Sequence, residues 1–149
     1  MASSPGVPPS PKRGLSEYEE GRQLGQGAYG AAIQAVRISD RRVFVLKKIV
    51  MRNVKSDKEE REVKREVMVM KMLAEKCDHP NIVAFYDAFM EKETLHIVME
   101  CADGGSLDDL IKTHRGNKQP ISMGQIVRLF TQLSMAVEAM HGANSELAT

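Results

Sequence analysis

The sequence contains no tryptophan, and phenylalanine and tyrosine together make up only 5% of its 149 residues. Neither charge sign dominates, and a formal net charge of +1 gives no general attraction to nucleic acid or to anionic membranes. No apolar run approaches the ~20 residues that a membrane span needs. The N-terminus also lacks the apolar segment that is typical of a secretory signal. We therefore expect one globular domain without nucleic-acid or membrane partners.

Cysteine is scarce as well, and Cys77 and Cys101 do not have metal-ligand spacing. The histidines also lack ligand spacing, so we expect no metal site at His79, His96, His114 or His141. Without a secretion signal, the two thiols are most simply reduced, which predicts a cytoplasmic location, with nuclear or cytoskeletal placement as alternatives. No cation neighbours Cys101 in the sequence, which favours an unreactive thiol.

Proline is concentrated at the N-terminus, where residues 1–16 hold four of the six prolines. This composition predicts a disordered tail. Residues 10–13, Ser-Pro-Lys-Arg, resemble a proline-directed phosphorylation site, although a solvated linker is the favoured interpretation.

In the rest of the chain, a strand-rich region is followed by a helical region. Five strands are expected: the first is a short polar edge strand, the second has alanines that would equally suit a helix, and the third has the strongest β-branched and apolar pattern. A capping box at Ser56 opens a long amphipathic helix that ends before Pro80. The expected strands are 17–24, 31–38, 43–50, 82–89 and 95–99, and the expected helices are 56–76, 107–113 and 122–141. Residues 102–105 are expected to form a hinge between the sheet region and the last two helices. The prediction is an α+β fold: a five-stranded antiparallel sheet with one helix over 17–101, then a hinge and helices over 102–149.

A glycine-rich loop connects the first two expected strands. It consists of Gly25, Gln26, Gly27, Ala28, Tyr29 and Gly30. Three glycines at this spacing let the backbone approach an anion and point its N–H groups at phosphate oxygens. The pattern alone is weak. A dinucleotide-binding unit is disfavoured, because a polar segment precedes the loop, a strand follows it, and lysines stand where that unit needs an acid.

Lys47 is the second candidate for chemistry, because it lies within the apolar strand 43–50 on the same face as Val45. A buried lysine must find an anion, although a lysine whose ammonium reaches out to solvent is an equal alternative at this point. Glu66 borders the apolar stripe of the following helix and can pair with Lys47 if that helix packs on the sheet. We expect this pair to be shielded from water.

The order of these motifs resembles that of protein kinases. The glycine loop, Lys47 and Glu66 are followed by residues 79–83, His-Pro-Asn-Ile-Val, and by residues 97–105, Ile-Val-Met-Glu-Cys-Ala-Asp-Gly-Gly. The sequence is most similar to the NIMA-related (NEK) serine/threonine kinases over residues 18–141. The resemblance implies a kinase N-lobe followed by the first helices of a truncated helical C-lobe.

The resemblance also implies that ATP is bound. The glycine loop, with Leu24, would cover the nucleotide, and Lys47, held by Glu66, would contact the α- and β-phosphates. Ala32 replaces the valine usual in the family, which thins the roof over the adenine.

The adenine-side residues are implied in the same way. Val45 would contact the base, and Met99 resembles the gatekeeper at the back of the pocket. The Glu100 carbonyl and the Ala102 backbone would bond the adenine edge, and Ser106 would meet the ribose.

No segment matches the H-R-D loop or its asparagine, D-F-G or A-P-E, and residues 114–116 come too early and lack an aspartate. The family's Mg²⁺ would therefore lack its protein ligands. We expect the 149 residues alone to be catalytically inactive, and protein substrates to require a longer form. The alternatives are a non-catalytic nucleotide- or partner-binding module, like a pseudokinase remnant, and a fragment that self-associates through the helical stripe from Ile126 to Met140.

Overall fold

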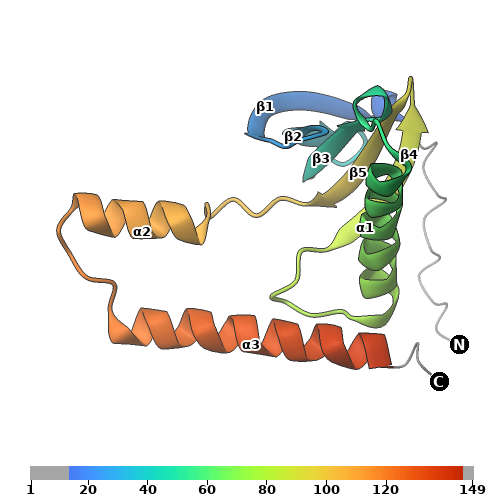
Figure 1. Ribbon diagram of the computed structural model, residues 1–149. Coiled ribbons are helices and arrows are strands. Elements are labelled where there is room, and N and C mark those ends of the chain that lie inside the picture. Colours follow the sequence, from blue (N-terminus) through green and yellow to red (C-terminus); the bar gives the residue numbers. More distant parts are fainter. Residues whose placement is uncertain (1–13, 146–149) are drawn as a thin grey trace, which may run out of the picture.

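The computed structural model describes residues 14–145 of the chain (Figure 1). Most of the expected tail and the whole Ser-Pro motif at residues 10–13 lie outside the described residues. The predicted boundary near residue 16 falls within a single 3₁₀ turn, Leu15–Glu17. The Leu15 backbone N–H donates to Glu91 Oε2 at 2.7 Å, which fixes this turn on the far edge of the sheet.

Five antiparallel strands form one sheet in the order β1-β2-β3-β5-β4. The strands are β1 Tyr18–Gln26, β2 Gly30–Arg37, β3 Val43–Val50, β4 Phe85–Glu91 and β5 Thr94–Glu100. The helices are α1 Asp57–Lys76, α2 Leu107–Gly116 and α3 Met123–Ser145, with a short 3₁₀ turn at Met51–Asn53. The predicted α+β fold, a five-stranded antiparallel sheet with one helix followed by further helices, is confirmed.

Strand β3 is central, and alternation along it divides the core into two clusters. Phe44 and Leu46 point to one face, where they pack with Ala35, Phe89 and Val98. On the opposite face, Ile49 packs with Ile97 of β5 and Val63 of α1. Helix α1 therefore covers the face of β3 that also carries Val45 and Lys47.

Helix α1 begins where the sequence predicts it. The Ser56 hydroxyl accepts from the Glu59 N–H at 3.3 Å, and the Glu59 carboxylate accepts from the Ser56 N–H at 3.2 Å. This reciprocal cap satisfies donors that the first turn would otherwise leave unpaired. Since the start of the helix is fixed, the position of Glu66 along it is fixed too.

Strand β4 differs from the prediction because it begins at Phe85 rather than at residue 82. The Ile82 N–H donates to the His79 carbonyl at 3.0 Å, and the Asn81 N–H lies 3.2 Å from His79 Nδ1. These bonds hold residues 79–82 in a turn that competes with extension into the strand.

Helix α3 starts as expected, with the Gln125 N–H donating to Ser122 Oγ, but continues to Ser145. Its second half meets α1, while α2 projects away from the sheet (Figure 1). The predicted apolar stripe is largely uncovered at Ile126, Phe130 and Leu133 in this structure. Among residues 14–145, no helix has both the length and the apolar character that crossing a bilayer requires.

Candidate nucleotide-binding site

A cavity of about 420 Å³ gathers the phosphate-side candidates from the glycine loop, β3 and α1. It is lined by Gly25, Gln26, Gly27, Ala28, Tyr29, Gly30, Ala31, Ala32, Lys47, Lys48, Ile49 and Glu66. Ligand sites for small molecules typically measure about 300–1,000 Å³. The fold thus brings the three glycines, the lysine and the glutamate to one hollow.

Lys47 and Glu66 meet on the wall of this cavity. Lys47 Nζ donates to Glu66 Oε1 and forms an ion pair with it. The two side chains are 38% and 42% exposed, so the pair is less shielded from water than the sequence analysis expects. An ion pair this exposed contributes little to folding stability, which leaves orientation of the ammonium as its main effect.

The glycine loop itself is held by backbone contacts. The Gly27 N–H donates to the Gly30 carbonyl at 2.7 Å, and the Gln26 side-chain amide donates to the same carbonyl at 3.0 Å. At Gly30, a Cβ atom would lie 1.8 Å from the Lys48 carbonyl oxygen, whereas Gly25 has open space. Only Gly30 is therefore demanded by close packing of the loop on β3.

Apart from Ala32, the adenine-side candidates lie outside this cavity. Val45 is buried and pairs in register with Met99, which packs against the core cluster around Ile49. Glu100 ends β5, and its backbone N–H donates to the Ala84 carbonyl at 2.8 Å. Ala102 is exposed in the segment that follows.

Leu24 is also absent from the cavity lining and is exposed near the end of β1. Glu100 instead lines a larger hollow of about 620 Å³ between the end of α1 and the start of β4. The Cys101 Sγ lies 3.9 Å from the Gln34 side-chain nitrogen.

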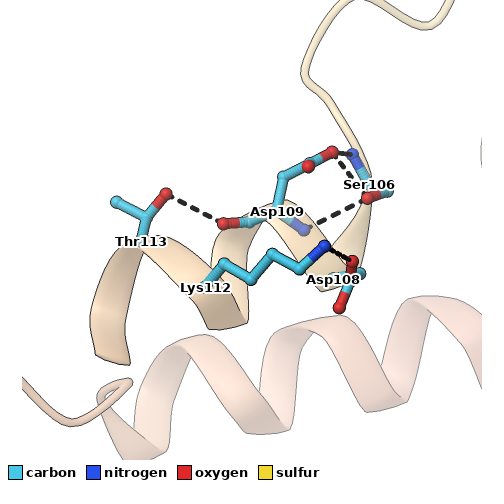
Figure 2. A network of polar contacts seen from close by, with 5 residues as sticks. All are labelled: Ser106, Asp108, Asp109, Lys112 and Thr113. Atoms are coloured by element: carbon cyan, nitrogen blue, oxygen red, sulfur yellow. Dashed lines mark hydrogen bonds and ion pairs between the residues drawn. The ribbon is translucent and has the colours of Figure 1, made fainter. Parts of the chain in front are cut away.

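Ser106 is the N-cap of α2 (Figure 2). Its hydroxyl donates to Asp109 Oδ2 at 2.6 Å and accepts from the Asp109 N–H at 3.1 Å. The pKa of the Asp109 carboxyl is lowered, first by the hydrogen bond from the Ser106 side chain. The predicted ribose contact would have to compete with this cap.

Sequence reasoning missed three residues of the cavity. Ile49 shares the face of Lys47 two positions away, so period-two alternation could have identified it. Ala31 and Lys48 also line the hollow, but the Lys48 ammonium pairs with Glu20 of β1. No sequence pattern links Lys48 to Glu20, because their contact depends on the register of three strands.

Comparison with known families identifies the family to which the chain belongs. The family model described as the protein kinase domain matches residues 18–145. The chain belongs to the protein kinase family. In the kinase order of motifs, the glycine loop, Lys47 and Glu66 come from the first lobe, and α2 and α3 begin the second.

The relatives include members of the NIMA-related group, as the sequence analysis predicts. Human serine/threonine-protein kinase Nek5 is 37% identical over 127 residues, which are 85% of this chain and 17% of Nek5. The probable serine/threonine-protein kinase nek3 of Dictyostelium discoideum is 32% identical over 87% of this chain and 11% of its own. Calcium-dependent protein kinase 24 of Arabidopsis thaliana is 37% identical over 64% of this chain and 16% of its own. The chain thus spans less than a fifth of each relative.

Protein kinases generally use ATP with Mg²⁺. The cavity lining fits the phosphates, since it combines a glycine-rich backbone with the Lys47 ammonium that Glu66 orients. The described residues fit the metal less well, because no group of three or more His, Cys, Asp and Glu side chains gathers in residues 14–145. Glu66, the one carboxylate among the residues that line the cavity, is paired with Lys47.

Proposed function

We propose that the chain forms the nucleotide-binding lobe and first C-lobe helices of a serine/threonine protein kinase, and that it binds ATP with the phosphates between the glycine loop and Lys47. The observation that carries this proposal is the Lys47–Glu66 pair on the wall of the cavity that the three glycines line.

The electrostatics of the site support phosphate binding. The Lys47 ammonium has three donors, and one of them is directed to Glu66. Two donors remain for phosphate oxygens, and the exposure of the side chain leaves them accessible. Glu66 fixes the direction of the ammonium, which reduces the entropy lost when a nucleotide binds.

The adenine end of the proposed site lies where β5 ends and the hinge begins. The register pair Val45–Met99 places these side chains side by side, next to the strand end at Glu100. We propose that a base held there contacts Val45, Leu24 and Ala32, and bonds the backbone of Glu100 and Ala102.

A cytoplasmic location, expected from cysteine usage, stays a prediction.

We also propose that residues 1–149 by themselves do not transfer phosphate. Bound ATP supplies the γ-phosphoryl group, but transfer to a serine or threonine hydroxyl needs a positioned base and metal ligands. The sequence contains neither H-R-D nor D-F-G. His114 lies in the last turn of α2, where its ring Nδ1 is 3.0 Å from the Leu110 carbonyl.

Thermal melting against ATP, with and without Mg²⁺, tests the proposal. ATP at 100 times its Kd should stabilise the fold by about 2.7 kcal/mol. Lys47→Ala should abolish the shift, and Glu66→Gln should weaken it. Lys64→Ala is the matched control, because it removes an equivalent ammonium paired with Glu60 on α1, outside the cavity.

Two outcomes refute parts of the proposal. A cooperative melt that ignores ATP refutes nucleotide binding and favours a partner-binding module, for which the uncovered stripe at Ile126, Phe130 and Leu133 is the supporting observation. Transfer of labelled γ-phosphate to a protein substrate by the purified chain, lost in Lys47→Ala, refutes the predicted inactivity. A chain with no cooperative melt would place the function in a longer protein.

A further inference from the structure

Tyr29, at the tip of the glycine loop, is turned toward the body of the protein. Its side chain is partly buried and packs against the cluster formed by Ile49, Val63 and Ile97. Its backbone carbonyl accepts from the Val50 N–H at 2.9 Å. Both the main chain and the side chain of the loop tip are therefore attached to elements outside the loop.

The following residue strengthens this attachment. The Gly30 backbone approaches the Lys48 carbonyl so closely that a Cβ atom there would lie 1.8 Å from the oxygen. The return of the loop is thus pressed onto β3, and it directs the Tyr29 side chain toward the sheet face that α1 covers.

The Tyr29 ring packs on the cluster that includes Val63, so the phenol lies beside the first half of α1. The pKa of the Tyr29 hydroxyl is raised by burial first and then by the negative charges of Glu59 and Glu62. Glu62 lies four residues before Glu66, and Val63 lies three before it, so each of them neighbours Glu66 on the helix surface. Glu66 and Tyr29 also line the same cavity.

We propose that Tyr29 is a positioning residue that ties the tip of the glycine loop to the turn of α1 preceding Glu66, so that the loop and the Lys47–Glu66 pair hold one mutual arrangement. The consequence for ATP rests on the proposed function, whereas the mechanical link between loop and helix does not. A loop fixed in this way keeps its backbone at the wall of the cavity before a ligand arrives.

Hydrogen exchange of the free chain tests the link. Tyr29→Ala should speed exchange several-fold at the α1 amides around Val63 and Glu66, relative to the amides of β5, which report opening of the whole sheet. Tyr29→Phe keeps the ring and should restore wild-type exchange. Tyr86→Ala is the matched control, because Tyr86 packs on Phe44 on the other side of the sheet.

A second measurement does not require Tyr29→Ala to fold. The ¹³Cζ signal of Tyr29, assigned by its loss in Tyr29→Phe, reports the phenol pKa. Glu62→Gln should lower that pKa by removing a nearby negative charge. Glu75→Gln removes the same charge about 20 Å further along α1 and should leave it unchanged.

The outcomes separate this proposal from the nucleotide-binding one. Unchanged α1 exchange in Tyr29→Ala, or a Tyr29 pKa that responds equally to Glu62→Gln and Glu75→Gln, overturns the link. If exchange and pKa respond as expected but ATP binds to no variant, the link stands and the nucleotide function fails. If ATP binds, its affinity should fall several-fold in Tyr29→Ala and recover in Tyr29→Phe.

Discussion

Alanine at Gly30 should force β2 away from β3. The new Cβ atom would lie 1.8 Å from the Lys48 carbonyl oxygen and 2.8 Å from the carbonyl carbon. Both atoms belong to the central strand, so neither can rotate away as a flexible side chain could. Raising 1.8 Å to the 3.0 Å below which real contacts essentially never fall requires a shift of about 1.2 Å.

The size of the effect follows from what this shift disrupts. Two short backbone bonds adjoin Gly30, from Val50 to the Tyr29 carbonyl at 2.9 Å and from Gly27 to the Gly30 carbonyl at 2.7 Å. Each bond contributes about 0.5–1.5 kcal/mol net, and overpacking costs about 1–3 kcal/mol. Lower entropy of the unfolded chain offsets about 0.4–1 kcal/mol. We expect a net loss on the order of 2–4 kcal/mol, or roughly 10 °C in Tm.

The neighbouring glycines provide the controls. Nothing lies within 4 Å of a Cβ atom at Gly25, and at Gly27 the nearest atom is the Gly30 carbonyl oxygen at 3.6 Å. Urea and thermal unfolding of Gly25→Ala and Gly27→Ala should stay within about 1 kcal/mol of wild type. A Gly30→Ala variant as stable as wild type, or an equal loss of stability in all three variants, would contradict the predicted clash with Lys48.

Two further predictions concern stability. His96 is only 3% exposed, and its pKa is lowered first by this burial and second by the charge of Lys48. The unfolded chain therefore binds more protons than the folded chain as the pH falls below 6.5. The unfolding free energy should therefore fall as pH drops below that value; His96→Phe should flatten the pH dependence of urea midpoints, and an unchanged slope would assign it to other groups. Ser56→Ala should lower the unfolding free energy by about 1 kcal/mol through the lost cap of α1. Ser106→Ala should fray only α2, which has few partners in the fold, and equal urea midpoints for the two variants would contradict this difference.

The parts of the fold that could be predicted are those with local determinants. The reciprocal cap at Ser56 is encoded within four residues, so the start of α1 follows from sequence alone. The apolar and β-branched residues of β3, interrupted by Lys47 and Lys48, likewise predicted its bounds. The start of β4 was misplaced because the bonds around His79 that delay it are not visible in hydrophobic patterning.

The candidate site divides in the same way. The order of motifs identified Lys47 and Glu66 together, because both lie in elements with strong local signals. Their shared exposure to water could not be predicted, since it depends on how α1 sits on the sheet. The inward packing of Tyr29 was missed for a related reason: the cluster of Ile49, Val63 and Ile97 that it packs against is assembled only by tertiary structure.

The order of the strands also has a consequence for how the chain folds. Strand β3 pairs on one side with β2, which directly precedes it, but on the other with β5, which follows only after the whole of α1 and β4. During synthesis, β1, β2 and β3 emerge first, and the apolar edge of β3 has no partner until residues 94–100 leave the ribosome. Because closing a long connection costs chain entropy, we expect the pairing of β5 with β3 to be a slow step of assembly. We expect nascent chains that stop before β5 to be the form most prone to aggregation, because they expose the strand that carries Lys47.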